Sequence, residues 1–186
     1  KGEDLPALAE RLRRQGRRRC VIRCGGSSAL GAAGFAAALR ELQAQAIAPT
    51  HIVFASSSGG THAGLLAGRA LTGLQAEIWG IRIDKEEAPD RPFSTEIAAL
   101  ASACADLLDL PAAPGLADVR LLEDWLGQGY GVVGAAEREA VGLAARFEGL
   151  LLDPVYTGRA FAGLLELIRR GTFHPEDRIL FWHTGG

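Results

Sequence analysis

The sequence HIVFASSSGGTHAG occupies residues 51–64 and joins an apolar run to a turn that is rich in serine and glycine. The run His51–Ser56 includes two β-branched residues, which predict a short buried strand. The small residues of 62–72 predict a helix that packs closely on a sheet. Residues 57–61 are therefore expected to form a loop between the strand and the helix.

This loop has the composition of a phosphate cradle. It contains Gly59 and Gly60 among several hydroxyl side chains. Glycine lets the backbone approach a ligand closely, and successive amides at a helix N-terminus point toward an anion. The loop therefore predicts a phosphate site, with a plain turn capped by Ser58 or Thr61 as the alternative.

Strands and helices are expected to alternate along the whole chain. Strands that alternate with helices of this length predict parallel crossovers, hence an α/β sheet covered on both faces, and ligands bind beyond the carboxyl ends of such strands. The loops that open at Gly25, Ser57 and Thr184 are therefore the candidate ligand loops. Strands are predicted over residues 19–24, 51–56, 76–84, 150–152 and 178–183, and helices over 5–15, 32–42, 62–72, 94–108, 135–147 and 158–169.

Composition excludes several classes of function. The chain has 186 residues, enough for one well-buried domain, and a net charge of −2 with both signs interspersed. Neither nucleic acid nor an anionic membrane is therefore expected as a partner, and the basic run 11–19 predicts a solvated helix face. No apolar run is long enough for a membrane span, and three cysteines without CxxC spacing favour a reducing, cytoplasmic setting. The four histidines lack metal-site spacing, so no metal is predicted.

Known nucleotide and hydrolase motifs are missing from the sequence. Asp84 ends a predicted strand at a distance suited to a ribose contact, but Thr61 stands where a dinucleotide fingerprint needs glycine. Neither GxxxxGK[ST] nor G-x-S-x-G occurs. The cradle therefore suits a phosphate monoester better than a nucleotide.

Three further clusters carry hydroxyls to the same edge of the predicted sheet. The loop 24–31 is rich in glycine and serine, and 152–160 presents Tyr156 and Thr157 just before a helix. Thr184 follows the last predicted strand, and the other tyrosine of the chain is Tyr130. Together these features place hydroxyls and phenols around one cradle.

Taken in order, these stretches resemble the D-cysteine desulfhydrase and 1-aminocyclopropane-1-carboxylate deaminase family, which has the tryptophan-synthase-β-like fold of pyridoxal-phosphate enzymes. The similarity runs over nearly the whole chain and implies pyridoxal 5'-phosphate as cofactor, a small amino acid as substrate and a homodimer. The motifs that carry it are GGS at 25–27 with ALG at 29–31, SGGTHAG at 58–64, GYGV at 129–132, DPVYTG at 153–158 and HTGG at 183–186.

The resemblance also implies roles for individual residues. The phosphate would be held by Ser57, Ser58, Gly59, Gly60 and Thr61, and Thr184 would lie near the pyridine nitrogen. Tyr130 and Tyr156 would face the substrate as catalytic residues.

Thr157 is implied as a further cofactor contact, where the deaminases carry glutamate and the desulfhydrases threonine. A neutral hydroxyl beside the pyridine nitrogen favours its protonation less than a carboxylate does. We therefore expect β-elimination with release of sulfide, pyruvate and ammonia. Cyclopropane ring opening and a non-catalytic module that binds a phosphorylated metabolite are the alternatives.

The chain departs from the family pattern at Ser28, where asparagine is usual, and at Ser57, where glycine is usual. Its only lysines are Lys1 and Lys85, and neither stands in the motif of the lysine that holds the cofactor covalently. We therefore expect a piece of a longer protein, inactive by itself. Residues 1–30 would end the smaller domain and its crossover, and 31–186 would form an incomplete cofactor-phosphate-binding larger domain.

Overall fold

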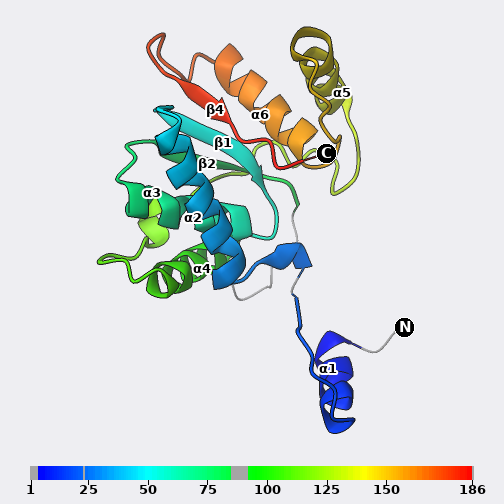
Figure 1. Ribbon diagram of the computed structural model, residues 1–186. Coiled ribbons are helices and arrows are strands. Elements are labelled where there is room, and N and C mark those ends of the chain that lie inside the picture. Colours follow the sequence, from blue (N-terminus) through cyan, green and yellow to red (C-terminus); the bar gives the residue numbers. More distant parts are fainter. Residues whose placement is uncertain (1–3, 23, 85–91, 186) are drawn as a thin grey trace.

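The computed structural model describes residues 4–22, 24–84 and 92–185. Its sheet has four strands, all parallel, in the order β3-β2-β1-β4 (Figure 1). The pairing begins with His51 opposite Glu77 and continues residue by residue along both central strands. The α/β class with a parallel sheet is therefore confirmed. The strands are β1 (His51–Ser56), β2 (Glu77–Arg82), β3 (Arg120–Leu122) and β4 (Ile179–Phe181).

Helices cover both faces of this sheet, as expected. One face carries α2, α3 and α4, and the other carries α6 with α5 packed against it (Figure 1). A single turn of 3-10 helix precedes α2, and a π-helical turn ends α5. The helices are α1 (Leu5–Arg14), α2 (Ala29–Ala44), α3 (Gly60–Thr72), α4 (Phe93–Leu107), α5 (Ala135–Leu143) and α6 (Thr157–Arg169).

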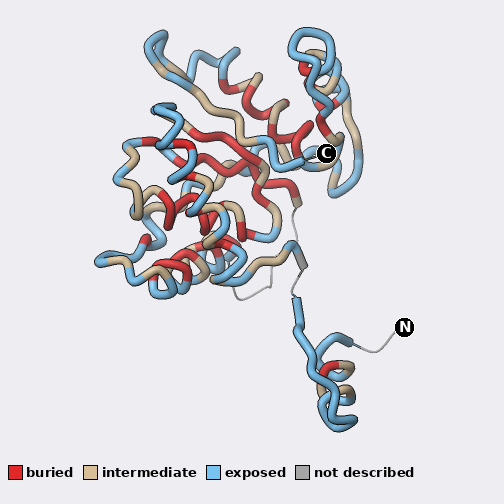
Figure 2. Tube along the Cα trace, in the orientation of Figure 1, coloured by how far each residue is buried: buried red, intermediate tan, exposed pale blue. Residues whose placement is uncertain are grey.

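The central strand β1 is buried on both faces because its side chains alternate. Ile52 and Phe54 belong to the core shared with α2, α3 and α4, whereas Val53 belongs to the core shared with α6. All three side chains are fully buried. The tube of β1 is coloured as buried along most of its length (Figure 2). Burial of such a side chain contributes about 1.5–3 kcal/mol. The carboxyl end of β1 is therefore a rigid base for the loop that follows it.

Two small residues of α3 make a contact that the sequence does not predict, although Ala63 and Ala67 share the core with β1 as expected. A Cβ added at Gly64 would lie 2.2 Å from the carbonyl oxygen of Ala32, and one at Gly68 would lie 2.8 Å from Ala36 Cα. Both glycines therefore face α2, not the sheet. They let the two helices that begin at the candidate ligand loops lie against each other.

Two predicted strands are wrong. Of residues 19–24, those that the structure describes form no strand, and Val21 and Ile22 are exposed. The segment leads away from the sheet, so no described strand pairs with it (Figure 1). Residues 150–152 form no strand either. Leu150 and Leu151 are exposed, so this apolar run is not buried as a strand in the sheet would be, and only the last of the three residues is buried. Residues 85–91, which join the predicted strand that ends at Asp84 to the next predicted helix, lie outside the described residues.

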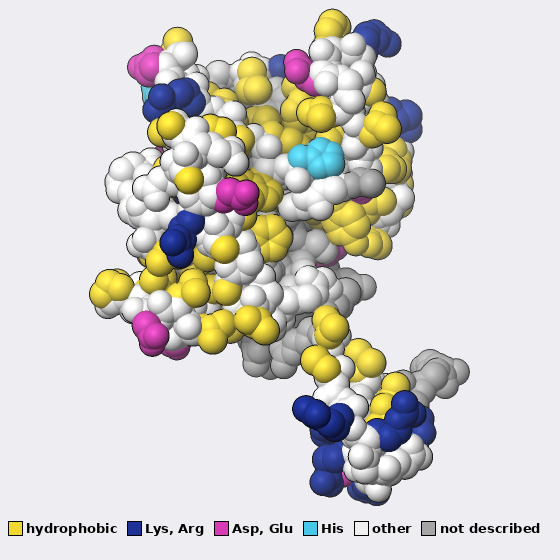
Figure 3. Space-filling view, viewed as in Figure 1, with side chains coloured by type: hydrophobic (Ala, Val, Ile, Leu, Met, Phe, Trp, Pro, Cys, Tyr) yellow, Lys and Arg dark blue, Asp and Glu magenta, His cyan; other side chains and the backbone are white. Residues whose placement is uncertain are grey.

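The N-terminal helix α1 stands apart from the body of the molecule (Figure 1). Its arginines are exposed and gather on this segment in the space-filling view (Figure 3). The predicted solvated basic face is therefore confirmed for the arginines of α1, whereas residues 17–19 are exposed but lie beyond the end of the helix. Of the helices that the structure describes, none has the length and apolar character that a membrane span requires.

Candidate active site

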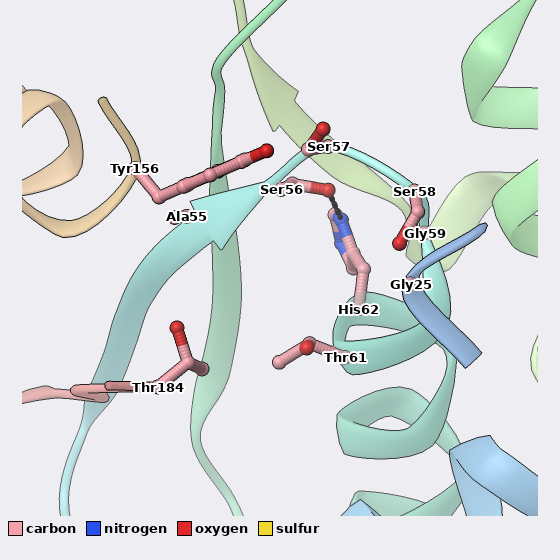
Figure 4. Close-up of a pocket in the computed structure, with 10 residues that line it drawn as sticks. All are labelled: Gly25, Ala55, Ser56, Ser57, Ser58, Gly59, Thr61, His62, Tyr156 and Thr184. Atoms are coloured by element: carbon pink, nitrogen blue, oxygen red, sulfur yellow. Dashed lines mark hydrogen bonds between the residues drawn. The ribbon is translucent and has the colours of Figure 1, made fainter. Parts of the chain in front are cut away.

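A pocket of about 210 Å³ opens at the carboxyl end of β1, where ligands bind in parallel sheets. Four separate stretches of the chain meet there: the turn before α2, the β1–α3 loop, the start of α6 and the segment after β4 (Figure 4). The predicted loops at Gly25, Ser57 and Thr184 are thus brought together. The pocket is lined by Gly25, Ala55, Ser56, Ser57, Ser58, Gly59, Thr61, His62, Tyr156 and Thr184.

The N-terminus of α3 forms one wall of this pocket. Its N-cap is Gly59, with φ of 82° in the left-handed region, and none of the described side chains caps the helix. The alternative of a turn capped by Ser58 or Thr61 therefore does not hold. The first amides of a helix lack partners within the helix, and its dipole favours an anion there. This wall is able to bind a phosphate.

The turn before α2 supports the β1–α3 loop from behind. Ser27 Oγ donates a hydrogen bond to Ser58 Oγ at 2.8 Å. A Cβ added at Gly25 would lie 2.2 Å from Ser58 Oγ, and one at Gly60 would lie 2.9 Å from Ser27 Oγ. Both glycines are therefore sites of close approach between the two loops. Gly60 belongs to this contact and is not itself among the residues that line the pocket.

His62 forms the floor of the pocket together with Ser56. The ring is fully buried, packs edge-on against Phe54 and lies with Nδ1 3.2 Å from Ser56 Oγ (Figure 4). Burial lowers the pKa of His62 from 6.5 to about 3, so the ring is neutral at physiological pH. Its Nε2 has no hydrogen-bond partner among the described residues.

Ser57 is held by Asp84, which lies two residues after the end of β2. Ser57 Oγ donates to Asp84 Oδ2 at 2.5 Å. Asp84 was considered above as a ribose contact, but here it orients the loop serine. The serine at residue 57 thus brings a hydroxyl to the loop that Asp84 binds.

The two tyrosines meet at the entrance. Tyr130 and Tyr156 share a short hydrogen bond between their hydroxyl groups, and their rings are edge-to-face with centroids 5.9 Å apart. Figure 4 shows Tyr156 extending across the end of β1 toward Ser57. Tyr130 does not line the first pocket. It lines an adjoining one of about 340 Å³ that also includes Tyr156, Ser57 and Asp84.

Thr157 lies beside the pocket but does not line it. Its side chain is buried, and its hydroxyl donates to Asp153 Oδ2 at 2.8 Å and accepts from the Asp153 amide at 3.0 Å. Asp153 also accepts from the amides of Val155, Tyr156 and Thr157, which orients the start of α6. Burial would raise the pKa of Asp153, but these hydrogen bonds hold it below its ordinary value.

Three comparisons with known proteins bear on this site. The sequence pattern of the family described as "Pyridoxal-phosphate dependent enzyme" matches residues 2–185. The chain belongs to this family. A D-cysteine desulfhydrase from Klebsiella pneumoniae (strain 342) is 43% identical over 187 residues, which cover 99% of this chain and 55% of that protein.

Solved structures agree with this assignment. A crystal structure described as an ACC deaminase homologue matches this chain with a TM-score of 0.82 at 32% identity. The match covers 96% of this chain and 52% of the homologue. A fungal L-serine ammonia-lyase from Rhizomucor miehei shows the same fold, with a TM-score of 0.58 at 18% identity. That match covers 100% of this chain and 61% of the ammonia-lyase. The family resemblance and pyridoxal phosphate as its cofactor are therefore confirmed. The chain spans about half the length of the curated relatives that it matches.

The residues present fit the family's cofactor. The uncapped N-terminus of α3 offers amides to a phosphate, and Gly60 stands where a side chain would push the supporting loop away. Thr184 and Tyr156 face the same pocket and offer hydroxyls to the remainder of the group. Lys1 and Lys85 lie outside the described residues. Within those residues, no cluster of three His, Cys, Asp or Glu side chains is arranged to hold a metal ion.

Sequence reasoning missed several residues that build this site. Asp153 could have been found, because an aspartate just before a helix is a common capping residue. His62 and Ser27 gave no separate signal, since their importance depends on loops that meet only in the fold. Arg159, which is buried in the first turn of α6 outside the pocket lining, was also missed, because nothing in the sequence distinguishes a buried arginine from a solvated one.

Proposed function

We propose that the full-length protein is a pyridoxal-phosphate-dependent lyase that degrades D-cysteine, with water, to pyruvate, hydrogen sulfide and ammonia. The observation that carries this proposal is the pocket at the end of β1, where the uncapped helix α3 and the hydroxyls of Tyr156 and Thr184 converge. The 43% identity to D-cysteine desulfhydrases over nearly the whole chain supports the choice of substrate.

The phosphate of the cofactor would be held by the backbone of residues 57–61, with Ser57 and Ser58 oriented by their hydrogen bonds. When bound, pyridoxal phosphate supplies an electron sink for the charge that develops at the substrate Cα. Thr184 would contribute its hydroxyl near the ring nitrogen. The hydroxyl of Thr157 is bound by Asp153. Thr157 would therefore act indirectly, by fixing the start of α6 next to the cofactor.

Tyr130 and Tyr156 would handle the proton that the leaving sulfur needs. Their hydroxyls are hydrogen-bonded to each other, so a proton lost from Tyr156 Oη can be replaced from Tyr130 Oη. Tyr156 lines both the cofactor pocket and the adjoining one, which places its hydroxyl between the two. This arrangement supports a role for Tyr156 as the acid toward sulfur and for Tyr130 as its partner.

Ring opening of 1-aminocyclopropane-1-carboxylate is the second candidate. The likeness to an ACC deaminase homologue favours it, at 32% identity. The higher identity to D-cysteine desulfhydrases, 43% over nearly the whole chain, favours β-elimination. The non-catalytic alternative has no observation in its favour beyond the phosphate cradle.

We further propose that the enzyme is a cytoplasmic homodimer in which residues 1–30 complete a smaller domain. The extended position of α1, apart from the sheet, supports that division (Figure 1). The free thiols of Cys20 and Cys104 suit a reducing compartment.

The test is turnover by the full-length protein loaded with cofactor. D-cysteine, L-cysteine and 1-aminocyclopropane-1-carboxylate are supplied separately, and sulfide, ammonia and 2-oxo acids are measured. We expect equal amounts of sulfide and pyruvate from D-cysteine, and a much lower rate from the other two. Ammonia and a 2-oxo acid from the cyclopropane substrate, without sulfide from D-cysteine, would instead establish the second candidate.

A further inference from the structure

Arg159 is a fully buried cation that the proposed chemistry leaves without a role. It lies in the first turn of α6, and only 1% of its surface is exposed. Its Nε donates to Glu137 Oε1 at 2.9 Å, and its Nη1 donates to the carbonyl of Ile83 at 2.9 Å. Its Nη2 donates to the carbonyls of Gly129 at 3.0 Å and Val132 at 2.8 Å. The guanidinium thus links α6 to α5, to the residue that follows β2 and to residues 129–132.

Glu137 is built to hold this cation in place. It is itself buried, and its second oxygen accepts from the Gly134 amide at 2.9 Å. Burial would raise the pKa of Glu137, but hydrogen bonds from its own amide, from Arg159 and from Gly134 hold it below the ordinary value. A buried ion pair is weak support for stability compared with apolar packing of the same volume. Its role here is therefore better sought in the geometry that it imposes.

The segment that receives two of these bonds carries Tyr130. Gly127, Gly129 and Gly131 have φ values of 59°, 133° and 75°, in conformations that other residues rarely adopt. A Cβ added at Gly127 would lie 3.4 Å from Arg159 Nη2, so the backbone is packed against the guanidinium. The two carbonyls that Arg159 binds flank Tyr130 on either side.

The other contacts of Arg159 lead to the same pocket. Ile83 precedes Asp84, which holds Ser57 in the cradle. Tyr156 stands three residues before Arg159, and its hydroxyl is bonded to that of Tyr130. One side chain therefore links the phosphate cradle and both tyrosines.

We propose that Arg159, locked by Glu137, is a positioning residue that sets the hydroxyl of Tyr130 against that of Tyr156. The inference rests on the proposed function, because it assigns Arg159 a purpose through the tyrosine pair. Arg159 touches neither pocket and takes no proton itself. It acts by fixing the backbone on both sides of Tyr130.

The test compares three variants of the full-length holoenzyme. Arg159→Lys keeps the positive charge but lacks the planar guanidinium that donates to four acceptors. Glu137→Gln keeps the side-chain shape but removes the negative charge that pairs with Arg159. Arg169→Lys is the matched control. Arg169 pairs with Glu139 between the same two helices, at 2.6 Å, but both side chains are about half exposed and far from the tyrosine segment.

We expect Arg159→Lys to lower kcat for D-cysteine about tenfold or more with little change in KM, and Glu137→Gln to do so less. Arg169→Lys leaves both constants unchanged. In a Tyr130→Phe background, Arg159→Lys adds less than about a twofold loss, because the phenol that it positions is already absent. Multiplicative losses in the double variant would overturn the proposal, since they would mean that Arg159 does not act through Tyr130.

A second readout needs no turnover. In cofactor-free protein, chymotrypsin cleavage after Tyr130 rises about tenfold in Arg159→Lys, while cleavage after the exposed Phe147 changes less than about twofold. Unchanged cleavage after Tyr130, or an equal rise at both sites, refutes the positioning role. If kcat is unaffected by Tyr130→Phe while cleavage follows this pattern, the proposed chemistry fails and the anchoring of the segment stands.

Discussion

The buried histidine under the cradle makes stability depend on pH in a way that can be calculated. Burial lowers the pKa of His62 to about 3, whereas the unfolded chain binds the same proton near 6.5. Between these values only the unfolded state is protonated, so the free energy of unfolding falls as the pH is lowered through 6.5. From pH 7 to pH 5 the loss is about 2 kcal/mol, since one pKa unit corresponds to about 1.4 kcal/mol.

The assay is urea unfolding of cofactor-free protein at pH 7, 6 and 5. His62→Gln removes the titrating ring, so the difference in stability between wild type and variant should shrink by about 2 kcal/mol over this range. His174→Gln is the control, because His174 is exposed and the buried ring stays in place. An unchanged difference between wild type and His62→Gln at all three pH values would show that the ring is not buried in its neutral form.

Two further predictions concern the packing that supports the site. Gly64→Ala should lower the free energy of unfolding by about 1–3 kcal/mol, because its methyl group would meet the Ala32 carbonyl; Gly34→Ala, with open space around it, should not. Denaturant unfolding distinguishes the two. Thr157→Val should cost about 1–3 kcal/mol in the same assay, because the buried hydroxyl is bonded twice to Asp153. A cost below experimental error would contradict these contacts.

The local sequence was sufficient for the central part of the fold. The predicted strand at residues 51–56 agrees with β1 in both limits, because a short β-branched run between turn signals has few other conformations. The glycine-rich loop after it was recognised for the same reason. Glycine at a strand–helix junction has a local, backbone meaning that does not depend on the rest of the fold.

Contacts between distant segments were less predictable. Residues 19–24 have the composition of a strand, but a strand needs a partner, and none of the described strands offers one. The close contact of Gly64 and Gly68 with α2 was not expected, because a small-residue pattern does not say which neighbour comes close. Arg159 and Glu137 were invisible for the same reason.

The predicted site residues show the same difference between local signals and contacts that depend on the fold. Ser57, Ser58, Gly59, Thr61, Tyr156 and Thr184 all line one pocket, as expected from loops at the same edge of a parallel sheet. Gly60 lies behind that lining, against Ser27. Tyr130 does not line the pocket but is hydrogen-bonded to Tyr156, which does. The Thr157 hydroxyl is bonded to Asp153. Their roles toward the cofactor and substrate stay predictions.

Retention of the cofactor by Gly60→Val tests the phosphate cradle most directly. The full-length protein is loaded with pyridoxal phosphate, desalted, reduced with borohydride and weighed intact, beside Gly34→Val as the control. The branched side chain at residue 60 would push against Ser27 and displace the loops from the anion, whereas Gly34 has open space. We predict one reduced adduct in wild type and Gly34→Val and almost none in Gly60→Val. A full adduct in Gly60→Val would contradict the assignment of residues 57–61 as the phosphate cradle.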